Sequence, residues 1–541
     1  MSASVLRKNA GWLALLVILI ISASLDAAAD RRVPLLEKRG DGRYLSKGRT
    51  VERGDAPRSR LFSFDGVSTR DLLGSPPAPV RALTAAEANV DTVRVLLIRV
   101  AFLTDRDDAL SSISTGGEFD LTPQGDAIID PTPHDKNYFH SHMIALRNYY
   151  HFQSCGRLEV TWDILPEGLE ESYKLSDLAD YGPGTTEIWT VERLVSFFRD
   201  GVLAADQALA GEGYPVRIGD YDAIVLAHAG SNLQSDVDYD TPNDIPSFFA
   251  RLGDDDRFTV DGGETVIVDG SVIPESASQD GFIGGIAAVL FHEFGHQLGL
   301  PDLYNIYTNN PTVGLWDIMD SGGLVGAYIE DEEGNLHYAE GFIPTGLSAW
   351  SKAFLGWADT RRVETFENEI ELSATEKCPA SVVRVDAGSD EYFLVENRAA
   401  ELDDLPTLPI VDETGVIIGM GNCLNCQDGF PETPIWELTN GYDLLLPTES
   451  DDISNDGGPG LLVWHIDESL IEERWEENLV NSIEPFGVTM LEASGVVDLG
   501  DPYSYFWMGW YDDAFYSGNN STLSDSTMPA SWSNWHVPTG V

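Results

Sequence analysis

A single stretch between residues 287 and 302 constrains this chain more than any other. It begins with an apolar run over 287–291 and continues through His292 and His296, which are four residues apart. Residues at this spacing lie on one face of an α-helix, one turn apart. Both imidazoles can then reach one zinc ion at about 2.0–2.1 Å. The apolar run predicts that the helix is buried, which fixes the rotamers that a metal site requires.

The residues around the second histidine complete a metal-binding pattern, HExxHxxGxxD. Gly299 suits the left-handed residue that ends a helix, and Pro301 prevents the helix from continuing. The turn carries Asp302 back towards the histidines, and its carboxylate is the predicted third ligand. The alternative is that Asp302 caps the next segment while another carboxylate binds the metal. Glu293 projects towards the open side of the ion, where it can accept a proton from a metal-activated water.

A second turn supports this interpretation. Seventeen residues after Asp302, a glycine-flanked turn presents Met319. Alone, such a methionine is ordinary core. Beneath two histidines it supplies a soft apolar floor that holds the imidazoles in place. The competing interpretation of the whole pattern is a buried amphipathic helix whose histidines only satisfy hydrogen bonds, which the joint spacing disfavours.

Charge excludes two classes of function. The chain has 541 residues, with 89 Asp and Glu against 33 Lys and Arg, so its net charge is −56. Binding to nucleic-acid phosphates needs clustered Lys and Arg, and anionic membranes repel such a surface. Because 43% of the residues are hydrophobic, the chain has enough apolar material for packed cores.

The N-terminus predicts export. Arg7 and Lys8 precede an apolar run over 11–23, which is shorter than the ~20 residues of a membrane span. Small residues at 27–29 offer a cleavage site, so we expect a signal peptide over 1–29 and a secreted, extracellular protein without a stable membrane span after cleavage. An uncleaved anchor is the alternative. Residues 30–90 are polar and turn-rich, which indicates a pro-segment or linker.

The remaining pattern predicts an α+β fold. Residues 91–360 alternate strands with helices and form the expected catalytic domain, whereas 361–541 form a β-rich C-terminal region packed on that domain. That region lacks an evident closing element, so a truncated form is an open alternative. The expected strands are 93–100, 158–164, 221–227, 391–396, 460–466 and 487–491, and the expected helices are 139–150 and 189–209.

Two further groups have weaker support. His228 ends a strand, and in α/β folds such a residue often faces a ligand, so it lines a cleft or serves the structure. Asp236, Asp238 and Asp240 repeat the start of a calcium loop, but Thr241 replaces the EF-hand glycine. An EF-hand is therefore excluded, and an irregular calcium loop stays open.

The four cysteines allow three complete disulfide pairings. They are Cys155, Cys378, Cys423 and Cys426. The last two, separated by two residues, either close a small loop or form half of a zinc knuckle, although no second pair at this spacing exists.

These pieces resemble the M6 family of metallopeptidases, the family of bacterial immune inhibitor A. The resemblance rests on the zinc pattern with Met319, and on segments at 148–150, 156–158, 221–223, 228–230, 347–352, 355–357, 392–398 and 460–467. It implies a metzincin-like α/β catalytic domain, a secreted zinc-dependent endopeptidase and a pro-segment, often with more C-terminal sequence than this chain has. Most metzincins have histidine as the third ligand, whereas Asp302 suits an M6-like site.

We therefore predict a secreted zinc endopeptidase that cleaves protein or peptide substrates, with one catalytic zinc ion and Glu293 as general base. One alternative is a non-catalytic surface adhesion or binding protein that keeps a metallopeptidase-like fold. The intact Glu293 argues against it, because a structural ion needs no base. A zinc hydrolase that acts on non-peptide bonds is a third possibility.

Overall fold

A computed structural model describes residues 32–38, 44–52 and 91–539 of the chain. Within the last range it leaves out residues 104–109, 114–115, 124–126, 213–215, 331–333, 343, 364–368, 374–380, 399–407, 412–416, 422–459, 505, 517 and 535.

A mostly parallel sheet forms the centre of the molecule. Its strand order is β4-β3-β6-β10-β7, with β5 also paired to β3. Only β7 runs antiparallel to its neighbour, and it forms one edge. Continuous apolar sequence such as 95–98 is typical of a strand covered on both faces, and these residues are fully buried. The strands are β3 (Asp91–Phe102), β4 (Leu158–Leu165), β5 (Tyr173–Leu175), β6 (Ala223–Ser231), β7 (Phe248–Arg251) and β10 (Asp269–Ser276).

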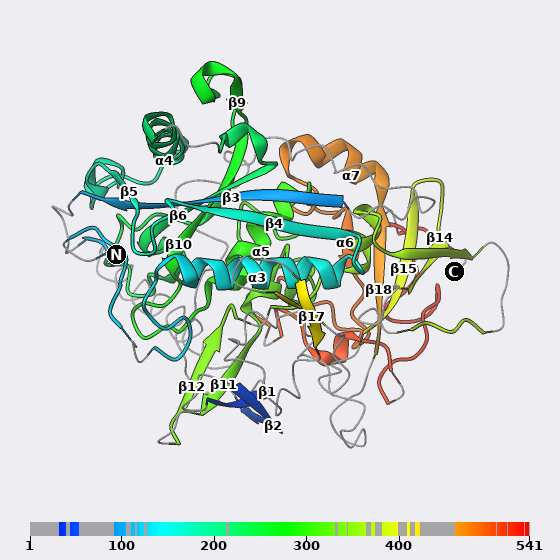
Figure 1. Cartoon of the computed structure of the whole chain (residues 1–541). Helices are drawn as coiled ribbons and strands as arrows, with labels where there is room; N and C mark the ends of the chain where they lie inside the picture. The colour runs from blue at the N-terminus through cyan, green and yellow to red at the C-terminus, as the bar shows by residue number, and fades with distance from the viewer. Residues whose placement is uncertain are drawn as a thin grey trace, which may run out of the picture.

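Helices cover both faces of this sheet. In Figure 1, α4 (Val191–Glu212) lies on one side, and α3 (Lys136–Gln153) and α5 (Ile286–Gln297) lie on the other. Helix α3 packs on β4, and α5 packs on β10 and β7. This arrangement places α5 beneath the antiparallel edge of the sheet.

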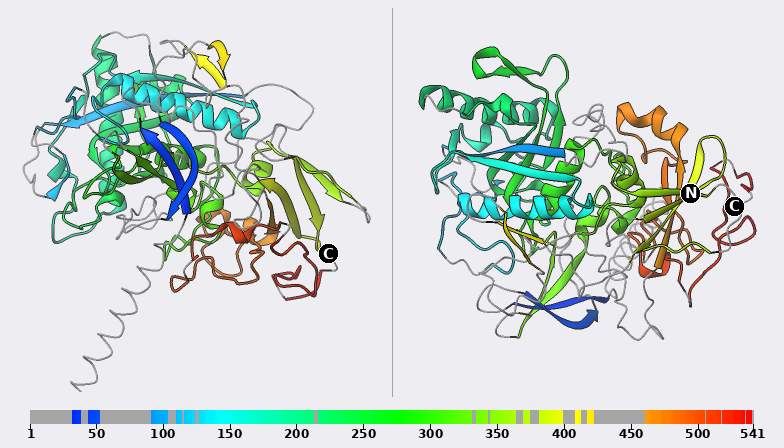
Figure 2. Two further views of the ribbon diagram at one scale, coloured as in Figure 1. Left: turned by 90° about the horizontal axis from the view of Figure 1, so that it is seen from below. Right: turned by 45° about the vertical axis from the view of Figure 1, so that its right-hand side comes forward.

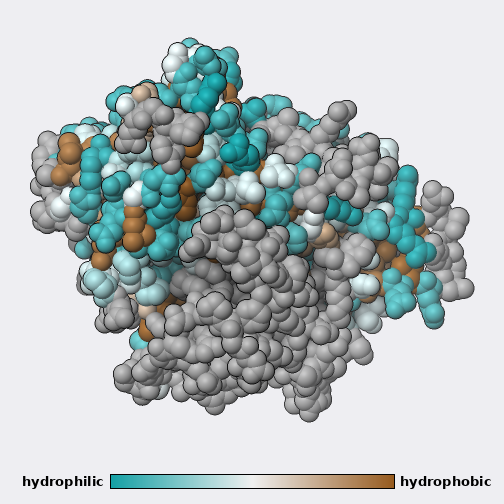
Figure 3. Space-filling view, in the orientation of Figure 1, coloured by the Kyte–Doolittle hydropathy of each residue, from teal (hydrophilic) through white to brown (hydrophobic). Residues whose placement is uncertain are grey.

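Two hairpins extend from the central layers. The hairpin of β8 (Phe258–Val260) and β9 (Thr265–Ile267) projects at the top of Figure 1, and the same region is largely teal, hence hydrophilic, at the top of Figure 3. The hairpin of β11 (Gly326–Glu330) and β12 (Leu336–Glu340) lies on the opposite side. The second hairpin holds the start of α5, because Gly285 donates its backbone N–H to the Glu340 carbonyl at 2.9 Å.

The predicted pro-segment contributes strands to that second hairpin. Strand β1 (Arg32–Lys38) pairs in parallel with β11, and β2 (Tyr44–Glu52) pairs with β1. The resulting sheet has the order β12-β11-β1-β2. This part of 30–90 is therefore paired with the predicted catalytic domain rather than separate from it.

The C-terminal region has a sheet of its own, with the order β13-β14-β15-β18-β19, which lies to one side of the central sheet (Figure 2). Helix α6 contacts β15 and β18. The bounds are β13 (Asp359–Val363), β14 (Ser381–Asp386), β15 (Glu391–Arg398), β16 (Leu408–Val411), β17 (Ile417–Gly421), β18 (Gly460–Asp467), β19 (Val488–Met490), α6 (Ala349–Phe354) and α7 (Glu468–Arg474).

All eight expected helices and strands are present, with ends that differ by a few residues. The mixed α and β content agrees with the expected fold class, and the domain boundaries at 90 and 360 stay predictions. The signal peptide lies outside the described residues, as do Cys378, Cys423 and Cys426, whereas Cys155 is disulfide-bonded. None of the helices in the described part combines the length and apolar character that crossing a bilayer requires.

Candidate metal centre

Helix α5 presents its two histidines to one point. Each imidazole is oriented by a backbone carbonyl: His292 Nδ1 lies 2.8 Å from the Ile318 carbonyl, and His296 Nδ1 lies 2.9 Å from the Leu300 carbonyl. A carbonyl only accepts, so each Nδ1 must carry a proton, which leaves Nε2 as the atom that can bind a metal ion. The two Nε2 atoms are 3.2 Å apart.

The end of α5 returns the chain to this point. Gly299 has φ of 97°, the left-handed conformation predicted for it. Its N–H donates to the His296 carbonyl at 2.9 Å, and the N–H of Leu300 donates to the Gly295 carbonyl at 3.0 Å. These bonds satisfy carbonyls that the helix end would leave without partners.

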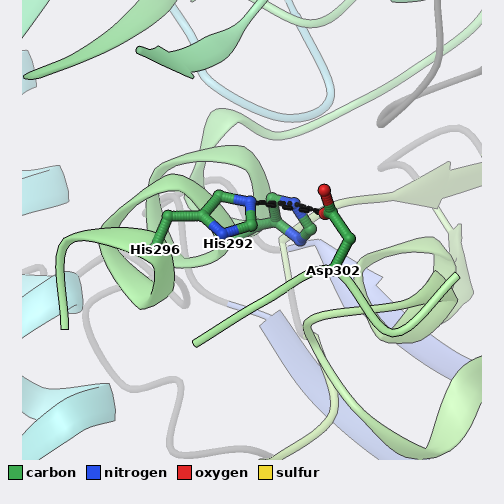
Figure 4. Close-up of side chains that lie close together, drawn as sticks. All are labelled: His292, His296 and Asp302. Carbon is green, nitrogen blue, oxygen red and sulfur yellow. Dashed lines mark hydrogen bonds and ion pairs between the residues drawn. The ribbon is translucent and has the colours of Figure 1, made fainter. Parts of the chain in front are cut away.

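Asp302 follows and completes a triangle of donor atoms. Its Oδ1 lies 3.3 Å from Nε2 of His292 and 3.3 Å from Nε2 of His296. Dashed lines in Figure 4 mark these contacts. A tetrahedral ion with bonds of about 2.0–2.1 Å separates its ligands by about 3.3–3.4 Å. Among the described residues no donor hydrogen-bonds this buried oxygen. Two nitrogens, one oxygen and their spacing therefore fit a zinc ion.

Charge in the triangle favours cation binding. Burial would raise the pKa of the Asp302 carboxyl, but the two histidines outweigh burial and hold that pKa well below its usual range. Burial likewise opposes a charged His296, yet Asp302 raises the pKa of this imidazole. The carboxylate thus stays ionised, and a positive group beside it is stabilised.

Glu293 is buried next to this triangle, with 5% of its surface exposed. Burial raises the pKa of its carboxyl to about 7, although the two neighbouring histidines lower it and Asp302 raises it further. A hydrogen bond from the backbone of Phe249, on edge strand β7, also favours the ionised form. A carboxyl that titrates near neutrality is suited to both accepting and releasing a proton.

Met319 lies against α5 between the two candidate histidine ligands, at Gly295. A Cβ built at Gly295 would lie 2.4 Å from the Met319 sulfur, so the absence of a side chain between the two histidines admits this methionine. The hydroxyl of Tyr150 donates to the Phe291 carbonyl at 2.6 Å from the same side. Met319 is itself fully buried.

Buried carboxylates hold the turn that carries Met319. Asp317 accepts from the N–H of Met319 at 2.8 Å and from the N–H of Ser348 at 2.8 Å. Asp320 accepts from three successive N–H groups at 312–314, and burial still raises its pKa to about 7. This turn also holds the segment that contains Asp302, because the next residue, Leu303, donates its N–H to the Met319 carbonyl at 2.9 Å.

The weaker candidates have different surroundings. The sequence predicts that a strand ends at His228, but β6 continues to Ser231, so this residue lies within the strand. His228 is 1% exposed and packs edge-on against Phe197, and burial lowers its pKa to about 4. Its role at a cleft stays a prediction. In the acidic loop, donor atoms of Asp236, Asp240 and Asp280 lie within 4.8 Å of one another, with Asp280 in place of the expected Asp238. Exposed acidic groups often gather without an ion, so calcium also stays a prediction.

Three contributors were not predicted from the sequence. Asn478 hydrogen-bonds Asp302, Phe249 hydrogen-bonds Glu293, and Asp130 accepts from the first N–H of α5. Each is distant in sequence from the residue it contacts and belongs to no periodic pattern. The only hints in the sequence are that residue 130 is an aspartate and residue 478 an asparagine. Both residue types are common in loops, so neither hint identifies a contact with the site.

Comparison with known proteins agrees with this centre. Residues 252–356 match the family described as immune inhibitor A peptidase M6, catalytic domain. The pre-pro-metalloprotease PrtV, from two strains of Vibrio cholerae serotype O1, is 40% identical over 75 residues. That match covers 14% of this chain and 7% of PrtV. The matched segment contains α5, Asp302 and Met319, so the part of the chain that carries the candidate metal centre is similar to the catalytic domain of the immune inhibitor A family of M6 peptidases.

Proposed function

We propose that this chain is a secreted zinc-dependent endopeptidase with a metzincin-like catalytic domain, in which Glu293 is the general base. The observation that carries the proposal is the triangle of two Nε2 atoms and one carboxylate oxygen that accepts no hydrogen bond from the described residues, with a buried carboxyl beside it. A structural ion would need no such carboxyl. Secretion rests on the predicted signal peptide over 1–29.

His292, His296 and Asp302 would hold the ion. A zinc ion bound there supplies Lewis-acid activation of a water molecule and of the scissile carbonyl. Glu293 takes the proton of the attacking water and then delivers it to the leaving amine. Its raised pKa, about 7, suits both transfers.

The edge strand β7 suits an extended protein or peptide substrate. It forms the end of the central sheet, and its Phe249 ring lies 5.9 Å from the His296 ring. An edge strand presents backbone N–H and C=O groups to which an extended peptide can add as a further strand. The scissile bond would thereby lie over α5.

Replacing Glu293 tests the mechanism. We expect Glu293→Ala and the isosteric Glu293→Gln to lower the rate of casein hydrolysis by about 10²–10⁴-fold, because general acid–base transfer is lost. Both variants should bind zinc at the wild-type stoichiometry. Casein cleavage by Glu293→Ala at the parent rate would exclude this mechanism.

The same assay separates the proposal from the non-catalytic alternative. After removal of the predicted signal peptide and pro-segment, residues 1–90, the wild-type chain should cleave casein. Addition of a metal chelator should abolish this activity. Bound zinc without any proteolysis would instead favour an adhesion or binding protein.

A further inference from the structure

Asn478, in the C-terminal region, contacts the third candidate ligand directly. We propose that Asn478 is a positioning residue of the metal centre, which restricts Asp302 to binding the ion through one oxygen, Oδ1. This inference rests on the proposed metal site, and it adds a contributor from outside the matched family segment, which ends at residue 356.

Two hydrogen bonds join the residues. The side-chain Nδ2 of Asn478 donates to Asp302 Oδ2 at 2.7 Å, and the backbone N–H of Asp302 donates to Asn478 Oδ1 at 3.0 Å. Both residues are almost fully buried, with exposed fractions of 0% and 1%. The carboxamide therefore fixes the plane of the carboxylate and occupies one of its oxygens.

The other oxygen is left for the ion. Asp302 Oδ1 faces both Nε2 atoms at 3.3 Å and accepts no hydrogen bond within the described part of the chain. An unconstrained carboxylate can chelate an ion with both oxygens, and the second bond would take the position that a water molecule needs. Because Nδ2 already holds Oδ2, rotation to a two-oxygen arrangement would break the 2.7 Å bond.

The backbone at 478 explains why an asparagine suits this position. Asn478 follows the short helix η10 (Trp475–Glu477) with φ of 52° and ψ of 39°, a left-handed conformation. Asparagine and glycine tolerate that conformation best. Glycine would satisfy the backbone but carries no amide for Asp302.

The loop around Asn478 is itself fixed to the ligand segment. Ile306 donates its N–H to Ser482 Oγ at 3.2 Å, and Asn305 donates from Nδ2 to the Ser482 carbonyl at 3.1 Å. Asn481 also reaches the Leu303 carbonyl at 3.3 Å. The carboxamide of Asn478 is thus held in place before any ion binds.

Asn478→Gly in the full-length chain tests this inference, because it removes the amide while keeping the left-handed backbone. We expect zinc affinity, measured by competition with a chromophoric chelator, to fall by about 10–100-fold. The matched control is Asn309→Gly, at an exposed left-handed asparagine with φ of 55°, which should keep the wild-type affinity.

Cobalt substitution provides a second readout that is independent of activity. Four-coordinate cobalt(II) absorbs visible light more strongly than five-coordinate cobalt(II). We expect weaker absorption per bound cobalt in Asn478→Gly, because Asp302 is then free to bind through both oxygens. Wild-type zinc affinity together with a wild-type cobalt spectrum would overturn the inference.

Two controls distinguish a failure of this inference from misfolding and from a failure of the proposed function. Circular dichroism establishes that each variant is folded, and if Asn478→Gly is not, Asn478→Ser takes its place, since its short hydroxyl cannot make both bonds. Failure of the wild-type protein to cleave peptides would contradict the proposed function, whereas the affinity comparison would still decide the role of Asn478.

Discussion

At the scale of single residues, the absence of a side chain at Gly295 allows Met319 to pack closely against α5 between the two histidines. A Cβ at this position would lie 2.4 Å from the Met319 sulfur and 3.2 Å from the Tyr150 hydroxyl. We expect Gly295→Ala to displace Met319 or tilt α5, and to destabilise the fold by about 1–3 kcal/mol through overpacking. Urea unfolding of the metal-free protein measures this change.

A paired substitution identifies the cause. Gly295→Ala combined with Met319→Ala should recover part of the loss, because the smaller floor makes room for the methyl group. If the double variant is less stable than the sum of both single changes predicts, the contact between the two positions is not the cause.

A buried acidic residue outside the site should make stability depend on pH. Burial raises the pKa of Glu492 to about 8, and the neighbouring Asp513 and Asp498 raise it further. The folded chain therefore holds a proton that an unfolded glutamate releases near its model value of 4.5. Stability from this group is fully present below that value and is lost as pH rises through about 8.

We thus expect the free energy of unfolding to decrease between about pH 6 and pH 9, and Glu492→Gln to remove about 2–4 kcal/mol of that decrease. Urea titrations of the metal-free protein at several pH values measure it. Glu484→Gln, at an exposed carboxylate, is the control. An equal decrease in Glu492→Gln and wild type would contradict the prediction.

At the scale of elements, helix α5, which carries the candidate ligands His292 and His296, begins without a side-chain cap of its own. Gly285 is its N-cap residue, and Asp130 supplies the missing acceptor by taking the Ile286 N–H at 3.0 Å. The other oxygen of Asp130 lies 3.2 Å from His142 Nε2. A buried anion at a helix N-terminus also interacts favourably with the helix dipole.

Asp130→Ala should therefore destabilise the protein by about 1–3 kcal/mol, since it leaves buried donors without an acceptor. Urea unfolding measures the loss. Asp135→Ala removes the cap of α3, which holds no ligand, and gives a matched comparison. We expect both variants to lose stability but only Asp130→Ala to weaken zinc binding, and equal zinc affinities would show that the start of α5 does not influence the ligands.

The same helix shows what a sequence can predict. The spacing of His292 and His296 and the glycine at 299 are local, so helix geometry alone predicts one shared face and a left-handed end, as observed. Asn478 and Asp130 lie 176 and 156 residues from their partners. Such contacts depend on how the chain folds back, and no periodic pattern encodes them.

At the scale of the whole molecule, the C-terminal region makes buried hydrogen bonds to the segments next to the candidate site. Arg398, 1% exposed on β15, donates to the Trp316 carbonyl at 2.7 Å and to Thr345 Oγ1 at 3.1 Å, beside the turn that carries Met319. Glu396 accepts from the Ala349 N–H at 3.2 Å and from Trp464 Nε1 at 2.9 Å. The bonds to Trp316, Thr345 and Ala349 cross the predicted boundary at residue 360.

A chain that ends at residue 360 should consequently fail to form the metal centre. It would lose the two bonds between Asn478 and Asp302, and it would expose the apolar surface that β15 and β18 cover on α6. We expect no cooperative unfolding transition by circular dichroism and less than one zinc ion per chain. A shortened chain with wild-type zinc content and cooperative unfolding would mean that the catalytic segment folds independently, and that the contacts from 396, 398 and 478 are dispensable.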